Sequence, residues 1–322
     1  SYNGTSFSAE TAFSTARGST GGGGASETAA IAATGDFGPP GVSNATESWN
    51  GSSWTEVADL NTARNSAAGA GRDNTAGLLF GGNTAPGNTT TANTEFFDGS
   101  SWTEVNNLNS GRYTLCGAGA TNTAALAFGG HAPSYASITE QWDGTNWTEV
   151  ADLNSARGYV MGGAGTQTSA LAYGGNIPPS PSTTLIATES WDGSSWTEVA
   201  DMNTPREALT GSGPSNTQAI GVGGEAPPLT GATETWDGTS WTEVADLNTA
   251  RKSLTEGAGL YDDFLTMGGD SGSITNIVEQ WDGTSWTEVA DLSNNIRSGS
   301  SSGASASAIY AAGYNGSARV GT

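Results

Sequence analysis

The sequence has 322 residues, and its 48 Gly residues are roughly twice the share of an average protein. The 10 basic and 32 acidic residues give a formal net charge of −22, which argues against a nucleic-acid backbone or an anionic membrane as the main partner. One Cys and one His exclude a disulfide framework, a Cys-rich metal site, a multi-His metal cage and a repeated Ser-His-Asp catalytic unit.

A pair of aromatic residues five positions apart recurs along the chain, usually as Trp-Asp-Gly-x-x-Trp. The seven pairs are Tyr2/Phe7, Trp49/Trp54, Phe97/Trp102, Trp142/Trp147, Trp191/Trp196, Trp236/Trp241 and Trp281/Trp286. Their second members are separated by 47, 48, 45, 49, 45 and 45 residues. A repeat of about 40 to 50 residues, with Gly and aromatic residues at fixed positions, is typical of β-propellers, in which each repeat forms a blade of four strands.

Each repeat predicts the same four strands in chain order. A stretch of very small residues, such as 67–71, predicts an innermost strand a, because the inner strands crowd around one axis. An apolar run that ends in a glycine pair, such as 78–82, predicts strand b. Strand c ends at the first aromatic residue, and the outer strand d begins at the second with an alternating pattern, as at 54–60. Asp-Gly or Asn-Gly between the aromatics predicts a tight turn.

The two ends of the chain are expected to complete one blade together. The chain starts at the end of a c strand and finishes with an a–b segment at 308–313. We therefore predict an all-β fold, a seven-bladed β-propeller of four-stranded blades that forms a single domain over residues 1–322. It has seven repeats of about 46 residues, with blade 7 formed by residues 286–322 plus 1–6. Such closure removes exposed sheet edges.

The repeat resembles the kelch repeat. The likeness rests on an apolar-Gly-Gly run, then Glu-x-Trp-Asp, then Trp-Thr-x-Val, and an Arg before the next inner strand, and it covers all seven units. The turn between the aromatics is about two residues shorter than is usual in kelch repeats, so the units are kelch-like. The amino-acid sequence of residues 236–251 is also similar to repeat arrays in structural and tail proteins of marine bacteriophages.

Length variation falls in the loops between strands b and c, which hold 11, 12, 9, 13, 9 and 9 residues. These loops share one face with the d–a connections, and loops on a rigid scaffold commonly bind partners. The resemblance to kelch-like propellers implies the same face. The residues predicted to contact a partner are Phe37, Pro86, His131, Tyr135, Ile177, Pro179 and Leu229. Alternatively, these side chains pack back onto neighbouring loops.

An Arg follows the second aromatic residue of each repeat after ten or eleven positions. These residues are Arg17, Arg64, Arg112, Arg157, Arg206, Arg251 and Arg297. One interpretation is a ring that holds an anion. The favoured one is structural, because a group present in every blade suits a pairing with a repeated acid that ties neighbouring blades. The candidate acids are Glu47, Glu95, Glu140, Glu189, Glu234 and Glu279.

Neither a metal nor a cofactor is predicted. Asp262, Asp263 and Asp270 place three carboxylates in one repeat, but without the spacing of a calcium-binding loop. Cys116 lies in a small-residue inner strand and is expected to be a buried, inert thiol.

The function expected is a non-enzymatic binding or structural module displayed on a virion surface, as a phage tail fibre, tail or capsid decoration. Its partners would be other virion proteins or a host surface receptor or glycan, with no nucleic acid and no membrane insertion. Because the chain begins at Ser1 without Met or a leader, we expect a longer precursor, and an attached region could make it oligomeric. The alternative is an extracellular or cell-surface bacterial adhesin or glycan-binding propeller.

Overall fold

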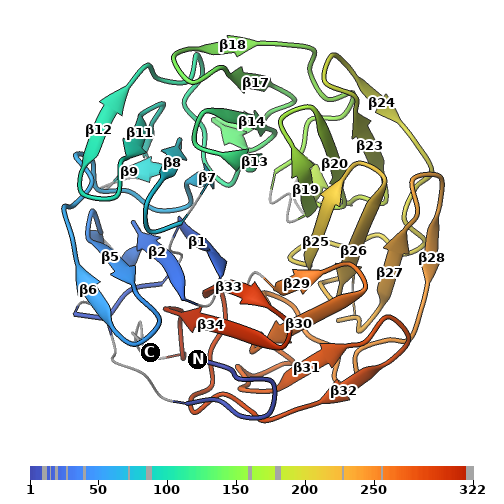
Figure 1. Ribbon diagram of the computed structural model, residues 1–322. Coiled ribbons are helices and arrows are strands. Elements are labelled where there is room, and N and C mark those ends of the chain that lie inside the picture. The colour runs from blue at the N-terminus through green and yellow to red at the C-terminus, as the bar shows by residue number, and fades with distance from the viewer. Residues whose placement is uncertain are drawn as a thin grey trace.

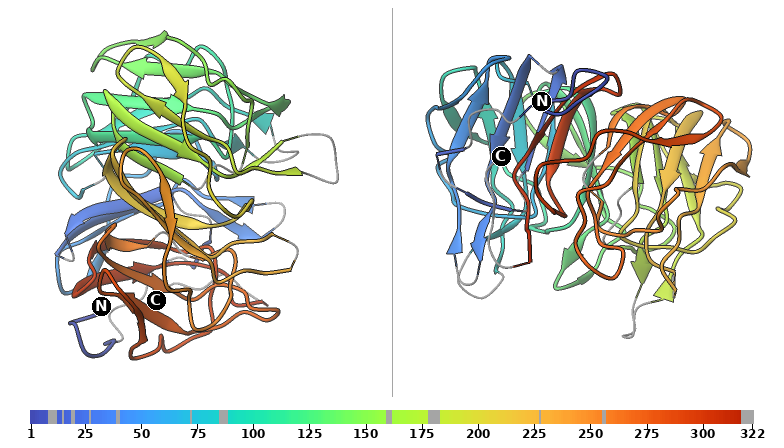
Figure 2. Two further views of the ribbon diagram at one scale, coloured as in Figure 1. Left: turned by 90° about the vertical axis from the view of Figure 1, so that its right-hand side faces the viewer. Right: turned by 90° about the horizontal axis from the view of Figure 1, so that it is seen from below.

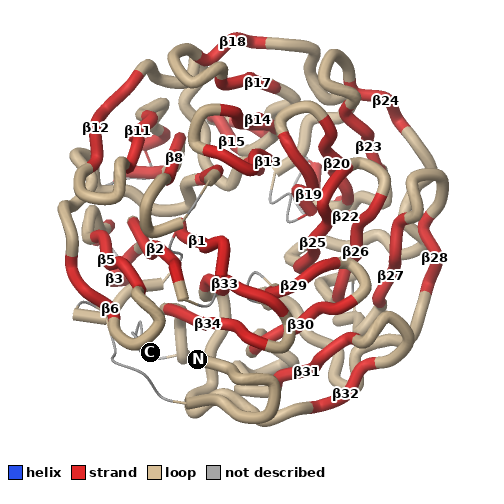
Figure 3. Tube along the Cα trace, in the orientation of Figure 1, coloured by secondary structure: helices blue, strands red, loops and turns tan. Residues whose placement is uncertain are grey.

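The chain folds into a ring of antiparallel sheets, in which strands are the only regular elements labelled (Figures 1 and 3). The computed structural model describes all residues except 9–12, 15, 19–20, 27, 39–40, 72, 85–88, 159–161, 178–182, 227, 255–256 and 317–322. Within these described ranges, no helix is long and apolar enough to cross a membrane.

Six sheets of the described chain have four strands each, and they are numbered here as blades 1 to 6. Blade 1 holds β1 (Gly21–Ser26), β2 (Ala29–Ala33), β5 (Thr46–Trp49) and β6 (Trp54–Glu56). Blade 2 holds β7 (Ala68–Ala70), β8 (Gly77–Phe80), β11 (Thr94–Phe97) and β12 (Trp102–Val105). Blade 3 holds β13 (Cys116–Thr121), β14 (Ala124–Phe128), β17 (Thr139–Trp142) and β18 (Trp147–Glu149).

The next three blades repeat this arrangement. Blade 4 holds β19 (Gly162–Thr166), β20 (Ser169–Tyr173), β23 (Thr188–Trp191) and β24 (Trp196–Glu198). Blade 5 holds β25 (Thr210–Ser215), β26 (Gln218–Val222), β27 (Thr233–Trp236) and β28 (Trp241–Glu243). Blade 6 holds β29 (Ala258–Leu260), β30 (Asp263–Met267), β31 (Val278–Trp281) and β32 (Trp286–Glu288).

The order of strands within each blade confirms the predicted a–b–c–d arrangement. In blade 5, for example, strand c ends at Trp236, which pairs directly with Trp241 at the start of strand d. The c strand buries Thr233, Glu234 and Trp236 and leaves Thr235 half-buried. The chain is therefore an all-β propeller of four-stranded antiparallel blades.

Two glycines end strand b because the backbone must turn there with positive φ. In blade 5 these are Gly223 and Gly224, with φ of 60° and 112°. A Cβ on Gly223 would lie 2.6 Å from the carbonyl oxygen of Arg251, and that oxygen accepts a hydrogen bond of 2.8 Å from the Gly224 N–H. The glycine pair thus joins one blade to the chain segment that enters the next.

The core lies between adjacent blades rather than inside one of them. One cluster joins Leu126 and Phe128 of blade 3 to Ala170, Trp191 and Trp196 of blade 4. The rings of Phe128 and Trp196 are 5.0 Å apart. Such contacts recur around the ring, so each sheet is covered on both faces by its neighbours.

The number of complete four-stranded blades among the described residues is six, and the prediction of seven is corrected in this respect. The remaining inner strands, β33 (Ser300–Ala304) and β34 (Ser307–Ala311), form a two-stranded sheet that lies between blade 6 and blade 1 (Figure 1). Tyr2 forms one bridge to Ala308 and one to Phe7. These are isolated bridges, too short to count as further strands.

Tyr2 nevertheless packs as a core residue beside this two-stranded sheet. Its side chain is 1% exposed and belongs to a cluster with Leu265, Met267 and Tyr310. Its N–H donates to the Ala308 carbonyl at 2.6 Å. The start of the chain is thus fixed against strand β34.

We expect Tyr2→Ala to lower the free energy of unfolding by about 3–5 kcal/mol, because it empties a large buried site. Tyr2→Phe should leave the stability unchanged or raised, because the buried Tyr2 hydroxyl has no hydrogen-bond partner. Urea denaturation of both variants measures the difference. An equal loss in the two variants, or none in Tyr2→Ala, would contradict this packing.

Candidate functional site

An Arg and a Glu form a buried ion pair in each of the six blades. The pairs and their N–O distances are Arg17–Glu47 (3.0 Å), Arg64–Glu95 (2.9 Å), Arg112–Glu140 (2.5 Å), Arg157–Glu189 (2.6 Å), Arg206–Glu234 (3.1 Å) and Arg251–Glu279 (2.7 Å). All twelve side chains are at most 1% exposed. The guanidinium comes from the segment that enters the blade, and the carboxylate comes from its strand c.

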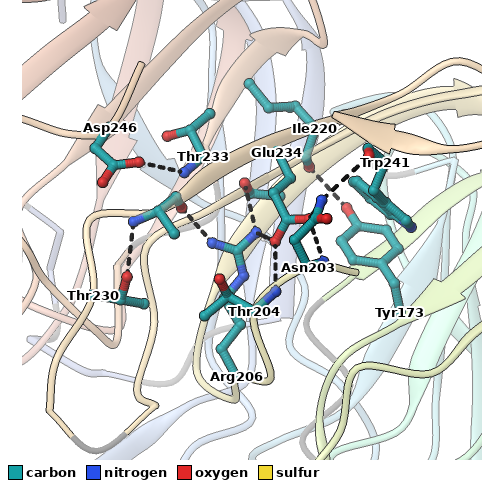
Figure 4. Close-up of polar contacts among 12 residues, drawn as sticks. Tyr173, Asn203, Thr204, Arg206, Ile220, Thr230, Thr233, Glu234, Trp241 and Asp246 are labelled. Atoms are coloured by element: carbon teal, nitrogen blue, oxygen red, sulfur yellow. Dashed lines mark hydrogen bonds and ion pairs between the residues drawn. The ribbon is translucent and has the colours of Figure 1, made fainter. Parts of the chain in front are cut away.

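The pair in blade 5 shows how each guanidinium is enclosed (Figure 4). Arg206 donates to Glu234 and to the backbone carbonyls of Gly221 and Ala232. Burial lowers the pKa of Arg206, while the charge of Glu234 opposes that shift. An anion would have to displace Glu234 to reach this guanidinium, so the geometry of this pair suits a structural role better than anion binding.

The same carboxylate also anchors the connection between blades. Glu234 accepts hydrogen bonds from the Asn203 N–H and side-chain amide at 2.7 and 2.8 Å. Asn203 follows strand d of blade 4, and its amide also donates to the Trp241 carbonyl of blade 5 (Figure 4). In addition, the Trp241 indole N–H donates to Thr188 of blade 4 at 2.9 Å. One buried acid therefore fixes the inner segment, the connection and the outer hairpin.

Arg297 does not belong to this set, which corrects the prediction. Its side chain is 33% exposed and pairs with Asp270 at 2.7 Å. The buried position ten residues after Trp286 is taken by Ile296, whose N–H donates to the Thr275 carbonyl and whose carbonyl accepts from the Gly269 N–H. Ile296 thus stands where the other blades have the buried Arg, and Arg297 occupies the next position, which corresponds to Lys252 in blade 6.

The position next to each buried Arg is variable, in contrast to the Arg itself. Each residue there forms a backbone bridge to the residue after the glycine-pair position, as does Arg297 next to Ile296, and we call these seven bridges the rim pairs. They are Gly18/Asp36, Asn65/Asn83, Tyr113/His131, Gly158/Asn176, Glu207/Glu225, Lys252/Asp270 and Arg297/Tyr314. No two of the seven pairs combine the same two residue types, although single types such as Gly, Asn and Asp recur, and all lie on the face that carries the b–c loops.

The b–c loops of blades 1 to 4 fold into hairpins of their own on this face. Their strands are β3 (Asp36–Gly38) with β4 (Gly41–Val42), β9 (Asn83–Thr84) with β10 (Thr89–Thr90), β15 (His131–Ala132) with β16 (Ser134–Tyr135), and β21 (Asn176–Ile177) with β22 (Thr183–Thr184). The last of these, yellow-green in the left panel of Figure 2, extends away from the body of the ring. We call this side, with its rim pairs, the hairpin face.

Four of the residues predicted to contact a partner have described side chains, and all four are half-buried. His131 packs between Tyr113 and Tyr135, with ring centroids 5.0 and 5.3 Å away. The ring of Tyr135 lies against Gly158 of the next rim pair, where a Cβ would come within 2.4 Å of it. Ile177 lies on β21, and Leu229 bridges Glu225. These side chains thus pack among the loops of the hairpin face.

The other predicted contact residues are not described in full. Phe37 lies on β3, but its side chain is outside the described part, and Pro86 and Pro179 fall outside the described residues altogether. Sequence reasoning missed Ile186 and Leu260, the large apolar side chains that are most exposed among those described, at 37% and 53%. No repeat signal marks either residue.

The carboxylates weighed as a metal site do not converge. Among the described residues, no three His, Cys, Asp or Glu side chains lie close enough together to hold an ion. Asp270 pairs with Arg297 instead. Cys116 is half-buried, which corrects the expectation of a buried thiol.

The buried ion pair predicts a large difference between two glutamates that lie directly opposite each other. Glu234→Ala should lower the free energy of unfolding by about 3–5 kcal/mol, because it leaves Arg206 buried without its counter-charge. Glu243→Ala, on the adjacent outer strand, should change it by less than about 0.5 kcal/mol, because Glu243 is exposed. Guanidinium chloride denaturation compares the two. Similar effects in both variants would refute a structural role for the pair.

The sequence matches no protein-family model and no curated protein. Among solved structures, the chain is similar to that of YjhT, with a TM-score of 0.62 and 14% sequence identity. The match covers 88% of this chain and all of the other. At this identity the likeness shows a shared fold, which agrees with the propeller described above.

Proposed function

We propose that the protein is a non-enzymatic binding module that recognises a macromolecular partner through its hairpin face. The contrast between two neighbouring positions carries this proposal. The buried Arg is the same in all six blades, whereas the rim pair beside it differs in every case. The constant Arg is explained by the needs of the fold alone. The variable rim pairs are explained by a surface that makes a different contact with its partner at each blade.

The described parts of several loops on this face are held by strand pairing. Strand β15 pairs with β16, and Ala136 N–H donates to the Gly130 carbonyl at 2.9 Å behind that hairpin. Rim residues also link neighbouring blades, as in the contact between Lys252 and Glu225. Loops held in this way lose little conformational entropy on binding, which favours recognition of a partner.

We place this module on the surface of a phage particle, as a tail fibre, tail or capsid decoration. The similarity of the repeat to arrays in phage structural and tail proteins supports this placement. The partner would be another virion protein or a receptor or glycan on the host surface. The charge of −22 favours a soluble, displayed particle over contact with acidic surfaces.

We further propose that the propeller is kelch-like and that the start of the chain adds to the two-stranded sheet to form an incomplete seventh blade beside the six complete ones. The two-stranded sheet β33–β34 lies where a seventh blade would stand, and Tyr2 bridges both strand β34 and Phe7. Phe7 and Tyr2 have ring centroids 4.8 Å apart, close to the distances within the other aromatic pairs. The start of the chain would supply the outer hairpin of this blade, and the Tyr2 variants test that arrangement.

Lysine-directed cross-linking offers a direct test, because Lys252 is the one Lys in the sequence and lies in a rim pair. Cross-linking of the native source, followed by mass spectrometry, should recover Lys252 joined to another virion protein or to a host surface protein. Lys252→Arg should abolish these products while retaining the contact with Glu225. Since Lys252 is 28% exposed, a reagent can reach it.

Recovery of the chain with purified virus particles, with Lys252 cross-links, would support the proposal. Recovery on bacterial cells without particles would favour an extracellular adhesin or glycan-binding propeller instead. A third outcome would contradict the proposal: the chain stays bound to its partner, but Lys252 forms no cross-link to that partner. If a small monofunctional amine reagent still modifies Lys252 in the complex, the contact lies on another face.

A further inference from the structure

A pocket of about 260 Å³ lies between blades 5 and 6, on the face opposite the hairpin face. It is bordered by the a–b and c–d turns, which share one face because successive strands run in opposite directions. Its walls include Trp236 and Asp237 of blade 5 and Tyr261, Asp262 and Trp281 of blade 6. The proposed function does not use any of these residues.

The pocket lies where a repeated contact between blades changes. In three other blades the a–b turn carries an amide side chain that donates to the first Trp carbonyl of the preceding blade. These contacts are Asn74 to Trp49, Gln167 to Trp142 and Asn216 to Trp191. Blade 6 has Tyr261 at this place, and its hydroxyl accepts a hydrogen bond of 2.8 Å from Gln218. The interface therefore lacks the amide that would reach the Trp236 carbonyl.

A second repeated hydrogen bond is lost at the same point. In blades 3, 4 and 5 the indole N–H of the first Trp donates to the a–b turn carbonyl of its own blade, at 2.8–3.1 Å. The corresponding donor in blade 6 is Trp281, which is 1% exposed and lines the pocket. Its indole N–H has no partner. A buried donor without an acceptor is unfavourable by about 1–3 kcal/mol, and a bound oxygen would relieve this.

The pocket also offers acceptors. Asp262 is exposed, and no residue in the described part of the chain donates a hydrogen bond to its carboxylate. Asp237 uses its Oδ1 to accept from Thr239 and Ser240, which leaves Oδ2 for a ligand. The Thr239 hydroxyl and these backbone N–H groups lower the pKa of Asp237, so its carboxylate stays ionised at neutral pH.

We propose that this pocket binds a single neutral pyranose ring, such as one unit of a glycan. Sugar hydroxyls both donate and accept, which matches carboxylate acceptors beside the Trp281 donor. Aromatic walls suit the apolar face of a sugar ring. An organic cation would leave the indole N–H unmet, and an anion would meet two carboxylates with no basic side chain in the wall. The volume is below the roughly 300–1,000 Å³ of sites for drug-sized ligands, so one ring fits.

The test is saturation-transfer NMR on the full chain with the methyl glycosides of glucose, galactose, mannose and N-acetylglucosamine. Methylammonium and acetate serve as cationic and anionic probes. We expect at least one sugar to bind with a Kd of about 1–10 mM, as is typical of a small neutral ligand in an open pocket. No sugar binding at about 50 mM, or binding of a charged probe alone, would overturn the proposal.

Two aspartates form a matched pair of variants. Asp192 makes the same turn contacts as Asp237 but lies in blade 4, away from the pocket. Asn supports this turn as well, since Asn50 accepts the equivalent hydrogen bonds in blade 1. Asp237→Asn should weaken sugar binding at least about tenfold, whereas Asp192→Asn should leave it unchanged. Equal effects in the two variants would overturn the assignment.

A third variant tests the origin of the pocket. Tyr261→Asn restores the amide that the other blades use, and it should close the pocket, abolish sugar binding and leave the fold intact. Undiminished binding by folded Tyr261→Asn would overturn the assignment of the pocket. If this variant fails to fold, the aspartate pair decides alone. None of these outcomes depends on the hairpin face, so the two proposals succeed or fail separately.

Discussion

The structure depends on burying a charged pair in every blade. A guanidinium and a carboxylate removed from water lose hydration free energy, and only close pairing with further hydrogen bonds offsets this loss. In blade 5 the requirement is met by Glu234, which serves Arg206 with one oxygen and Asn203 with the other. The chain must therefore bring three segments to one point, and this geometry fixes where each blade begins relative to the last.

This constraint separates the interior of the ring from its two faces. The paired charges, the indole contacts between blades and the glycine pairs leave little freedom within a repeat. Both proposed sites lie where the residue type is not the same in every repeat. The rim pairs lie one residue beyond the buried Arg, and the pocket forms where Tyr261 replaces an amide. A regular scaffold with local exceptions can thus carry separate sites on opposite faces.

Much of this architecture could be predicted from the sequence, because local signals repeat. The Asp-Gly turns, the aromatic pairs and the small inner residues each specify a strand and its place. The count of complete blades was wrong, because the start of the chain forms only isolated bridges to Ala308 and Phe7 where two strands were expected, and the aromatic pair alone does not reveal how far the pairing extends. Arg297 was misplaced because Ile296 takes the buried place ten residues after Trp286, and the sequence does not show that an apolar residue replaces the ion pair there.

The sites were harder to predict than the fold. Loop length pointed to the hairpin face, but the sequence could not show that His131 packs between two tyrosines. The pocket residues belong to the most repetitive part of the chain, where Asp237 and Asp192 look alike. Asp237 differs from Asp192 only in that Tyr261 of the next blade lies beside it in the pocket, and the spacing of residues in the sequence does not show which side chains meet between blades. Tyr261 was the available signal, since blades 2 to 5 all have Asn or Gln at the corresponding position of the a–b turn.

Hydrogen exchange at the connections between blades tests the central claim most directly. The amide N–H groups of Asn61, Asn109, Asn154, Asn203 and Asn248 all donate to the buried glutamates. If these pairs hold the ring together, the five amides exchange only through global unfolding, with the same free energy and the same dependence on denaturant. Exchange of these amides by local opening, well below the global free energy, would show that the connections move independently of the blades and would contradict the account.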